Sequence, residues 1–204
     1  MTTPKDAREG LLLTAERLIG EGGAAVSLRE IAVAAGQRNN SAVAYYFGSR
    51  DGLIEAIIAR RLEAMETERM RLLAGHEQNP PDDLLRSLVA VLVHPMFTTP
   101  YAEGSTHYAR FLEKVRDHPA VMLQPLADDR WPATRIITTR LEQSLGPLPH
   151  AVRRQRLAAM VTAMFALIAD AERRGELASR ATRDGVVDML VGLLTARVAE
   201  TAVS

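Results

Sequence analysis

The chain has 204 residues, 47% of them hydrophobic, which is enough for one all-helical unit of ordinary size or for two small domains. Basic and acidic residues number 25 each, so net charge alone does not indicate a nucleic-acid partner. No cysteine is present, which excludes disulfides, thiolate metal ligands and a cysteine nucleophile. Residues 1–9 are polar and no run of about 18 apolar residues occurs, so we expect a cytoplasmic protein without a membrane-spanning segment.

The first predicted helix covers residues 5–20. Its apolar residues recur at the spacing of one helix face: Leu11, Leu12, Ala15, Leu18 and Ile19. Gly22 and Gly23 follow and end the helix. The letters of residues 20–25 also fit a dinucleotide-binding fingerprint, but they follow a helix instead of a strand, so we interpret them as a helix end.

Residues 27–47 predict two short helices joined by a tight turn. Ser27 can accept a hydrogen bond from the backbone three residues on while Glu30 reaches back, which is the pattern of a capping box. Gly36 can adopt the left-handed backbone conformation that ends a helix. A capped helix, a glycine turn and a second short helix together indicate a helix-turn-helix, the motif that docks in the major groove of DNA.

The second helix of this pair would enter the groove. Asn39 or Asn40 can cap its start. We expect Val43, Ala44 and Phe47 to pack inward. The residues expected to project outward are polar, small or aromatic: Arg38, Asn40, Ala42, and Tyr45 or Tyr46.

A long amphipathic helix is predicted from residue 50 to about residue 74. Gly48 and Ser49 break the preceding helix and cap the new one, and Asp51 lies in its first turn. Its apolar positions are Leu53, Ile54, Ile57, Ile58, Leu62, Met65 and Leu72. Such a helix spans about 35 Å, because each residue adds about 1.5 Å, and it can therefore connect two domains.

Prolines and acidic residues divide the next part of the chain into further helices. The predicted helices are residues 84–97 and 103–116, followed by one helix or a pair of helices over residues 120–145. Pro125 and Pro132 indicate a kink or a short interruption in the last of them.

The last two predicted helices, residues 150–174 and 184–200, are apolar on more than one side. Helices of this kind need burial on two faces, and a second subunit supplies the second face. We therefore expect a homodimer. The predicted interface residues are Leu157, Val161, Ile168, Val187, Leu190, Val191, Leu194 and Val198.

The N-terminal region, about residues 7–60, resembles the TetR/AcrR family of one-component transcriptional repressors. The matching residues are Gly22-Gly23, Ser27-Leu28-Arg29-Glu30-Ile31-Ala32, Ala35-Gly36, Tyr46-Phe47 and Ser49-Arg50 with Leu53. Between Gly36 and Phe47 the chain has one residue more than the usual pattern, with Ala44 where a tyrosine is common and Ser41 where a glycine is common. The remainder matches the family in its plan, an all-helical regulatory domain that ends in two dimerising helices.

The resemblance implies an all-α fold of about nine helices. An N-terminal three-helix DNA-binding domain with a helix-turn-helix would occupy residues 1–49, and a C-terminal ligand-binding and dimerisation domain residues 50–204. The implied function is that of a sequence-specific transcriptional regulator, a repressor that leaves its palindromic operator when a small molecule binds. The expected partners are double-stranded operator DNA, a small-molecule effector and a second copy of the chain, with no cofactor, metal or membrane.

The candidate DNA contacts combine phosphate-binding and base-reading side chains. They are Ser27, Arg29, Arg38, Asn39, Asn40, Ser41, Ala42, Tyr45, Tyr46 and Arg50. Ser27 with the first amides of its helix, and Arg50 at the start of the next, can bind phosphate. The stretch from Arg38 to Asn40 suits base edges or flanking backbone, and the tyrosines suit phosphate or a thymine methyl.

The candidate ligand pocket is apolar with a few polar groups, as small-molecule sites usually are. Its predicted residues are Met65, Leu92, Met96, Phe97, Tyr101, His107, Tyr108, Phe111, Met122, Trp131, Met160, Met164 and Phe165. Methionines on several helices make an adaptable lining, which favours a lipophilic ligand.

Other functions have weaker support in the sequence. The five histidines show no i, i+4 pair that would indicate a metal site. Nucleophile-elbow, zinc-protease and phosphate-loop motifs are all missing, so we do not expect an enzyme. The alternatives to a repressor are an activator or architectural DNA binder, or a helical small-molecule-binding protein without a DNA function.

Overall fold

A computed structural model describes residues 4–37, 39, 41–98, 107–122 and 129–197, apart from the side chains of Ala24 and Met122. Within these ranges the chain forms ten α-helices and one 3-10 turn and contains no strand, which confirms the all-α prediction. The elements are α1 (Pro4–Gly22), η1 (Gly23–Ala25), α2 (Leu28–Ala34), α3 (Ala42–Phe47), α4 (Arg50–Gln78), α5 (Leu84–Thr98), α6 (Tyr108–Lys114), α7 (Pro119–Met122), α9 (Pro132–Ser144), α10 (His150–Arg174) and α11 (Arg180–Thr195). Of the helices so described, none is both long and apolar enough to cross a membrane.

The predicted helix-turn-helix is present, with its two helices as α2 and α3. The capping box at the start of α2 is complete: the Ser27 hydroxyl accepts from the Glu30 amide at 3.2 Å, and the Glu30 carboxylate accepts from the Ser27 amide at 2.7 Å. Gly36 follows α2 with a φ of 70°, as the turn requires. Helix α1 packs across α2 and buries Leu11 and Ile19 completely.

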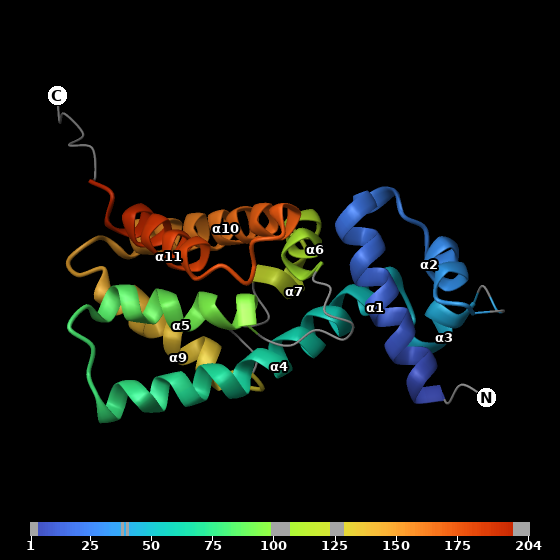
Figure 1. The fold of residues 1–204 in the computed structure, drawn as a ribbon, viewed down its shortest axis with the longest axis horizontal. Coiled ribbons are helices and arrows are strands. Elements are labelled where there is room, and N and C mark those ends of the chain that lie inside the picture. The colour runs from blue at the N-terminus through green and yellow to red at the C-terminus, as the bar shows by residue number, and fades with distance from the viewer. Residues whose placement is uncertain (1–3, 38, 40, 99–106, 123–128, 198–204) are drawn as a thin grey trace.

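The long helix α4 begins at a tight corner after α3. The Ser49 hydroxyl caps it by accepting from the Gly52 amide at 3.0 Å. A Cβ atom at Gly52 would lie 2.1 Å from the Phe47 carbonyl oxygen, so only glycine fits here without a shift of the backbone. From this corner α4 runs out of the N-terminal unit and along the rest of the molecule (Figure 1).

The remaining helices form the other end of the molecule (Figure 1). Helices α5 and α9 lie between α4 on one edge and the adjacent pair α10 and α11 on the other. The short helix α6 packs against both α10 and α1, so it lies where the two ends meet. Helix α4 likewise contacts α1 and α3 with its first turns and α5 and α9 with its later ones.

Several boundaries differ from the predicted ones. Helix α11 begins at Arg180 because the Ser179 hydroxyl caps it, accepting from the Thr182 amide at 3.2 Å. The segment predicted as one helix or a pair over residues 120–145 contains two described helices, α7 and α9, and residues 123–128 lie outside the described part. The helix predicted from residue 103 is α6, which starts at Tyr108, and residues 99–106 also lie outside it.

Candidate functional site

The outward face of α3 carries an aromatic pair. Tyr45 is 81% exposed, and its ring lies edge-on against that of Tyr46 with the centroids 4.9 Å apart. Tyr46 itself is half-buried and packs against the core. Ser41 before the helix and Arg29 on α2 are also exposed. These side chains make the surface a duplex could contact.

The start of α3 differs from the sequence prediction. Its N-cap residue is Ser41, whereas Asn39 accepts a hydrogen bond from the Ser41 amide at 2.9 Å. Ala42 and Val43 are buried while Ala44 is exposed. The inward face therefore begins one residue earlier than expected, and Ala42, predicted as a DNA contact, is covered by protein. Arg38 and Asn40 fall outside the described residues.

Two predicted phosphate ligands are engaged in the fold. The Ser27 amide, expected to bind phosphate, already donates to the Glu30 carboxylate. Hydrogen bonds from Ser27, first its side chain and then its backbone, lower the pKa of Glu30, so a negative charge occupies this helix end. A phosphate here would meet that charge.

Arg50 lies at the start of α4 but points into the protein. Its Nη1 donates to the Val26 carbonyl at 2.5 Å and its Nη2 to the Gly23 carbonyl at 3.5 Å. The side chain thereby ties the connection between α1 and α2 to α4. Its role in this structure is to stabilise the N-terminal unit of α1, α2 and α3, which we call the reading unit.

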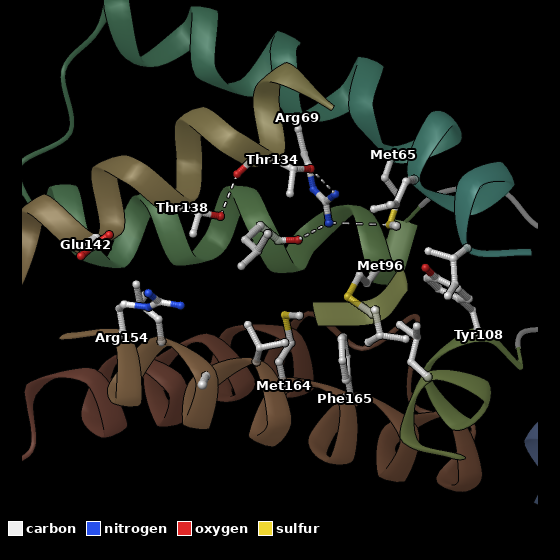
Figure 2. A pocket seen from close by; sticks show the side chains of 18 of the residues that line it. Met65, Arg69, Met96, Tyr108, Thr134, Thr138, Glu142, Arg154, Met164 and Phe165 are labelled. Atoms are coloured by element: carbon white, nitrogen blue, oxygen red, sulfur yellow. Dashed lines mark hydrogen bonds between the residues drawn. The ribbon is translucent and has the colours of Figure 1, made fainter. Parts of the chain in front are cut away.

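A cavity of about 490 Å³ lies in the C-terminal part, within the usual range of small-molecule pockets, roughly 300–1,000 Å³. Residues of α4, α5, α6, α7, α9 and α10 line it, and Figure 2 draws most of their side chains. Of the predicted pocket residues, those that line it are Met65, Leu92, Met96, Tyr108, Met164 and Phe165. Sequence patterns also missed apolar lining residues: Ile58, Leu62, Leu112, Val121, Leu157, Ala158 and Val161.

The other predicted pocket residues lie elsewhere. Phe97, Phe111 and Met160 are buried core residues that do not line this cavity. His107 is half-buried beside Arg110, and burial, followed by the charge of Arg110, lowers its pKa. Trp131 lines a second, more polar cavity of about 470 Å³. Tyr101 and the side chain of Met122 lie outside the described part.

The cavity has polar lining residues that the sequence analysis did not identify. They are Arg69, Thr134, Thr138, Glu142, His150 and Arg154. Thr134, Thr138 and Glu142 follow each other at intervals of four residues, so they face the cavity from one side of α9 (Figure 2). That spacing was visible in the sequence, but it does not tell which face of α9 is inward.

Helix α6 connects this cavity to the N-terminal unit. Tyr108 lines the cavity, and its ring lies 5.6 Å from the guanidinium carbon of Arg61. Arg61 in turn forms a two-pronged buried ion pair with Glu16 of α1, at 2.6 and 2.5 Å. Helix α1 also approaches α6 directly, since a Cβ at Gly20 would come within 3.2 Å of the His107 carbonyl oxygen and 3.3 Å of the Phe111 amide nitrogen.

Five of the eight predicted interface residues are buried within a single chain. Ile168, Val187, Leu190 and Leu194 have no exposed surface within a single chain, and Leu157 is 8% exposed. The first four form the internal packing between α10, α11 and their neighbours, and Leu157 lines the cavity, so these five side chains are not available as the contact surface of a dimer. Val161 and Val191 are half-buried, and Val198 lies beyond the described part. The apolar residues of α11 are buried because α5 and α10 of the same chain pack against this helix.

The fold and the motif define a helix-turn-helix regulator of all-helical type. Residues 11–57 match the sequence profile of the bacterial regulatory proteins of the tetR family. This match covers the helix-turn-helix region, so the N-terminal part of the chain has the DNA-binding domain of that family.

A comparison with solved structures bears on the fold. A protein from Rhodococcus sp., assigned to the TetR-family transcriptional regulators and solved as a crystal structure, is similar with a TM-score of 0.50 and 18% sequence identity. The similarity covers 93% of this chain and 97% of that one, so it extends through the C-terminal helices. At this identity it supports the fold alone. No curated protein matches the sequence significantly.

Proposed function

We propose that this regulator is a homodimeric repressor that leaves its operator when a small, amphipathic molecule occupies the cavity lined by α4, α5, α6, α7, α9 and α10. The observation that carries the proposal is the contact of one short helix, α6, with both the cavity and α1. A ligand against Tyr108 would act on a helix that also touches the reading unit. Repression needs no chemistry, only affinity for DNA that depends on the state of the cavity.

The DNA-binding surface would be the exposed part of α2 and α3. Tyr45 supplies a ring and a hydroxyl at the most exposed point of α3, and Arg29 supplies a charge for the phosphate backbone. In a two-fold dimer, two such surfaces would contact two half-sites about one turn of the duplex apart.

The dimer would use the outward faces of the last two helices. On α10 these carry Ala159, Thr162 and Ala166, and on α11 Met189 and Gly192, all of them exposed in the single chain. Met189 is 53% exposed, which is unusual for a large apolar side chain. Small residues around it allow two helices of a second copy to approach closely.

Release from DNA would be a population shift. A ligand that prefers, by a factor of about 100, a conformer in which the recognition helices are mis-spaced contributes about 2.7 kcal/mol against DNA binding. The helices that would move together are α6 and α4, because both contact the cavity and α1.

The test is binding of the purified chain to its own upstream DNA at two salt concentrations. Specific, salt-dependent binding is expected, and the Tyr45→Ala variant should weaken it strongly while leaving stability nearly unchanged. Met70→Ala, an exposed apolar residue on α4, is the matched control and should bind as the wild type does. The absence of any salt-dependent affinity would favour a small-molecule-binding protein without a DNA function.

Individual contacts can then be separated. Arg29→Ala should lower the affinity for all sequences alike, whereas Asn40→Ala should change sequence preference. Equal loss in both variants would contradict the assignment of Asn40 to base reading. A transcription assay with the bound promoter distinguishes a repressor from an activator or an architectural binder by the sign of its effect.

A further inference from the structure

The polar groups of the main cavity are divided between an exposed end and a buried end. His150, Arg154 and Ala158 are exposed and Glu142 is half-buried, so this end opens to solvent. Arg69 is only 2% exposed. Figure 2 shows Glu142 and Arg154 together at one end of the cavity and Arg69 away from them, nearer Met65.

The guanidinium of Arg69 has more donors than acceptors around it. An arginine carries five N–H donors. Nη1 donates to the Thr134 hydroxyl and Nη2 to the Leu92 carbonyl, both at 3.1 Å, with a weak 3.9 Å contact to the Met65 sulfur. The Nε of Arg69 is buried and has no hydrogen-bond acceptor among the described residues. An unsatisfied buried donor of a charged group is costly and attracts an acceptor.

The carboxylate of Glu66 acts on Arg69 through its charge, but its hydrogen bonds go to α9. Glu66 accepts from the Ala133 amide at the start of α9 and, at 3.1 Å, from the Thr134 hydroxyl. It does not line the cavity, whereas Arg69 does. Burial lowers the pKa of Arg69, and the charges of Tyr108 and Glu66 only oppose that effect. The inner end of the cavity therefore presents positive charge in a medium of low polarity.

Among the described residues that line the cavity, the one carboxylate, Glu142, is at the exposed end and has basic neighbours of its own. Glu142 lies 3.3 Å from the His150 ring nitrogen and 3.9 Å from the Arg153 Nε. Its charge is thus balanced locally. Between the two ends the walls are apolar, with Leu92 and Met96 on α5 facing Met164 and Phe165 on α10.

We infer that the cavity binds an amphipathic carboxylic acid, with the carboxylate at Arg69 and the apolar body between α5 and α10. A carboxylate has the planar, two-oxygen geometry that a guanidinium fork binds best. It would supply the acceptors that Arg69 lacks and a counter-charge inside the protein. The inference rests on the proposed function only in taking this cavity as the effector site.

The first experiment compares acids with their neutral analogues on the full-length chain without DNA. Decanoate is paired with decanamide and naphthoate with naphthamide, and binding is measured by isothermal titration calorimetry at neutral pH. Each acid that binds should bind at least about tenfold more tightly than its amide, because a hydrogen-bonded charge pair replaces a neutral contact. Equal binding of acids and amides, or no binding by any acid, overturns the inference.

Two arginine variants locate the acid group. Arg69→Met should abolish the preference for acids, and Arg69→Lys should reduce it, since it keeps the charge without the fork. Arg154→Met, at the exposed end, is the matched control and should keep the preference. The opposite pattern would place the acid at the exposed end and overturn the inference. If Arg69→Met fails to fold by circular dichroism, the acid and amide comparison on the wild type still decides.

The same ligands separate this inference from the proposed function. An acid preference that depends on Arg69 without any release of DNA would leave the ligand class standing and contradict the proposed induction. Release of DNA by acid and amide alike would support induction and contradict the ligand class.

Discussion

The N-terminal reading unit and the cavity end of this protein are held together by contacts of different range. In the reading unit the hydrogen bonds that cap the helices join residues three positions apart, as in Ser27 with Glu30 and Ser49 with Gly52. At the cavity, the side chain of Arg69 bonds to residues on other helices, Leu92 of α5 and Thr134 of α9, the latter more than sixty positions away. Local signals therefore define the motif, and the tertiary fold alone defines the ligand site.

The largest expected loss of stability concerns the buried ion pair of Glu16 on α1 with Arg61 on α4, which joins the two ends of the molecule. Glu16→Ala should lower the free energy of unfolding by about 3–5 kcal/mol, because it leaves the buried Arg61 without its carboxylate. The control is Glu9→Ala, which removes a more exposed partner of the neighbouring Arg60 and should cost less than about 1 kcal/mol. Urea denaturation of both variants measures the difference. Equal losses would mean that burial of the pair is not what stabilises the joint.

The corner between α3 and α4 comes next. Gly52→Ala should cost about 1–3 kcal/mol and weaken specific DNA binding, because its methyl group would collide with the Phe47 carbonyl. Gly75→Ala on the same helix has open space and should stabilise the protein by up to about 1 kcal/mol. The two variants are compared by chemical denaturation. A neutral Gly52→Ala would show that the corner can relax at no cost.

The next prediction tests how much the short-range capping bond of Ser27 stabilises the reading unit. Ser27→Ala should lower stability by about 1 kcal/mol through loss of the α2 cap. Ser41→Ala is matched to it, because Ser41 occupies the N-cap of α3 without a side-chain cap bond, and its stability should hardly change. Thermal unfolding of both variants is the measurement. Equal destabilisation would contradict the role of the Ser27 hydroxyl.

The smallest effect concerns pH. Hydrogen bonds from Ser27 lower the pKa of Glu30 below its ordinary value of 4.5, so this carboxylate stabilises the fold above that value. The contribution is lost as the pH falls through the lowered pKa. Glu30→Gln keeps a capping amide but cannot titrate, so its stability should depend less on pH in this window than that of the wild type. Urea denaturation of both proteins at neutral and acidic pH measures this dependence. If the stability of the variant falls with pH as much as that of the wild type, the role of Glu30 is contradicted.

The sequence predicted the motif well because its signals are local. The capping box, Gly36 and the long helix after Phe47 all have the expected structure. The error lay in the phase of α3, where Ala42 is buried and Ala44 exposed. The start of a six-residue helix fixes its faces, and the three consecutive N-cap candidates before it, Asn39, Asn40 and Ser41, offer more than one start.

The cavity was predicted less completely, for a physical reason. Apolar residues such as Met164 and Phe165 could be expected inside, and they line the cavity. Arg69 and Thr138 could not, since polar residues on a helix are usually on its solvent side. The apolar pattern of α11 likewise predicted burial correctly but could not tell which helices provide it. Val187 and Leu190 are buried by helices of the same chain, not by a second subunit.

Helix α6 has seven residues, too few to persist as an isolated helix in water. Its first amides are held from outside, because the buried carboxylate of Glu172 on α10 accepts from the amides of Ala109 and Arg110 at 3.0 Å. The helical state of this segment is therefore conditional on its neighbours. Loosening α10 would allow α6 to unwind, and the support that it gives to α1 would be lost in the same cooperative step.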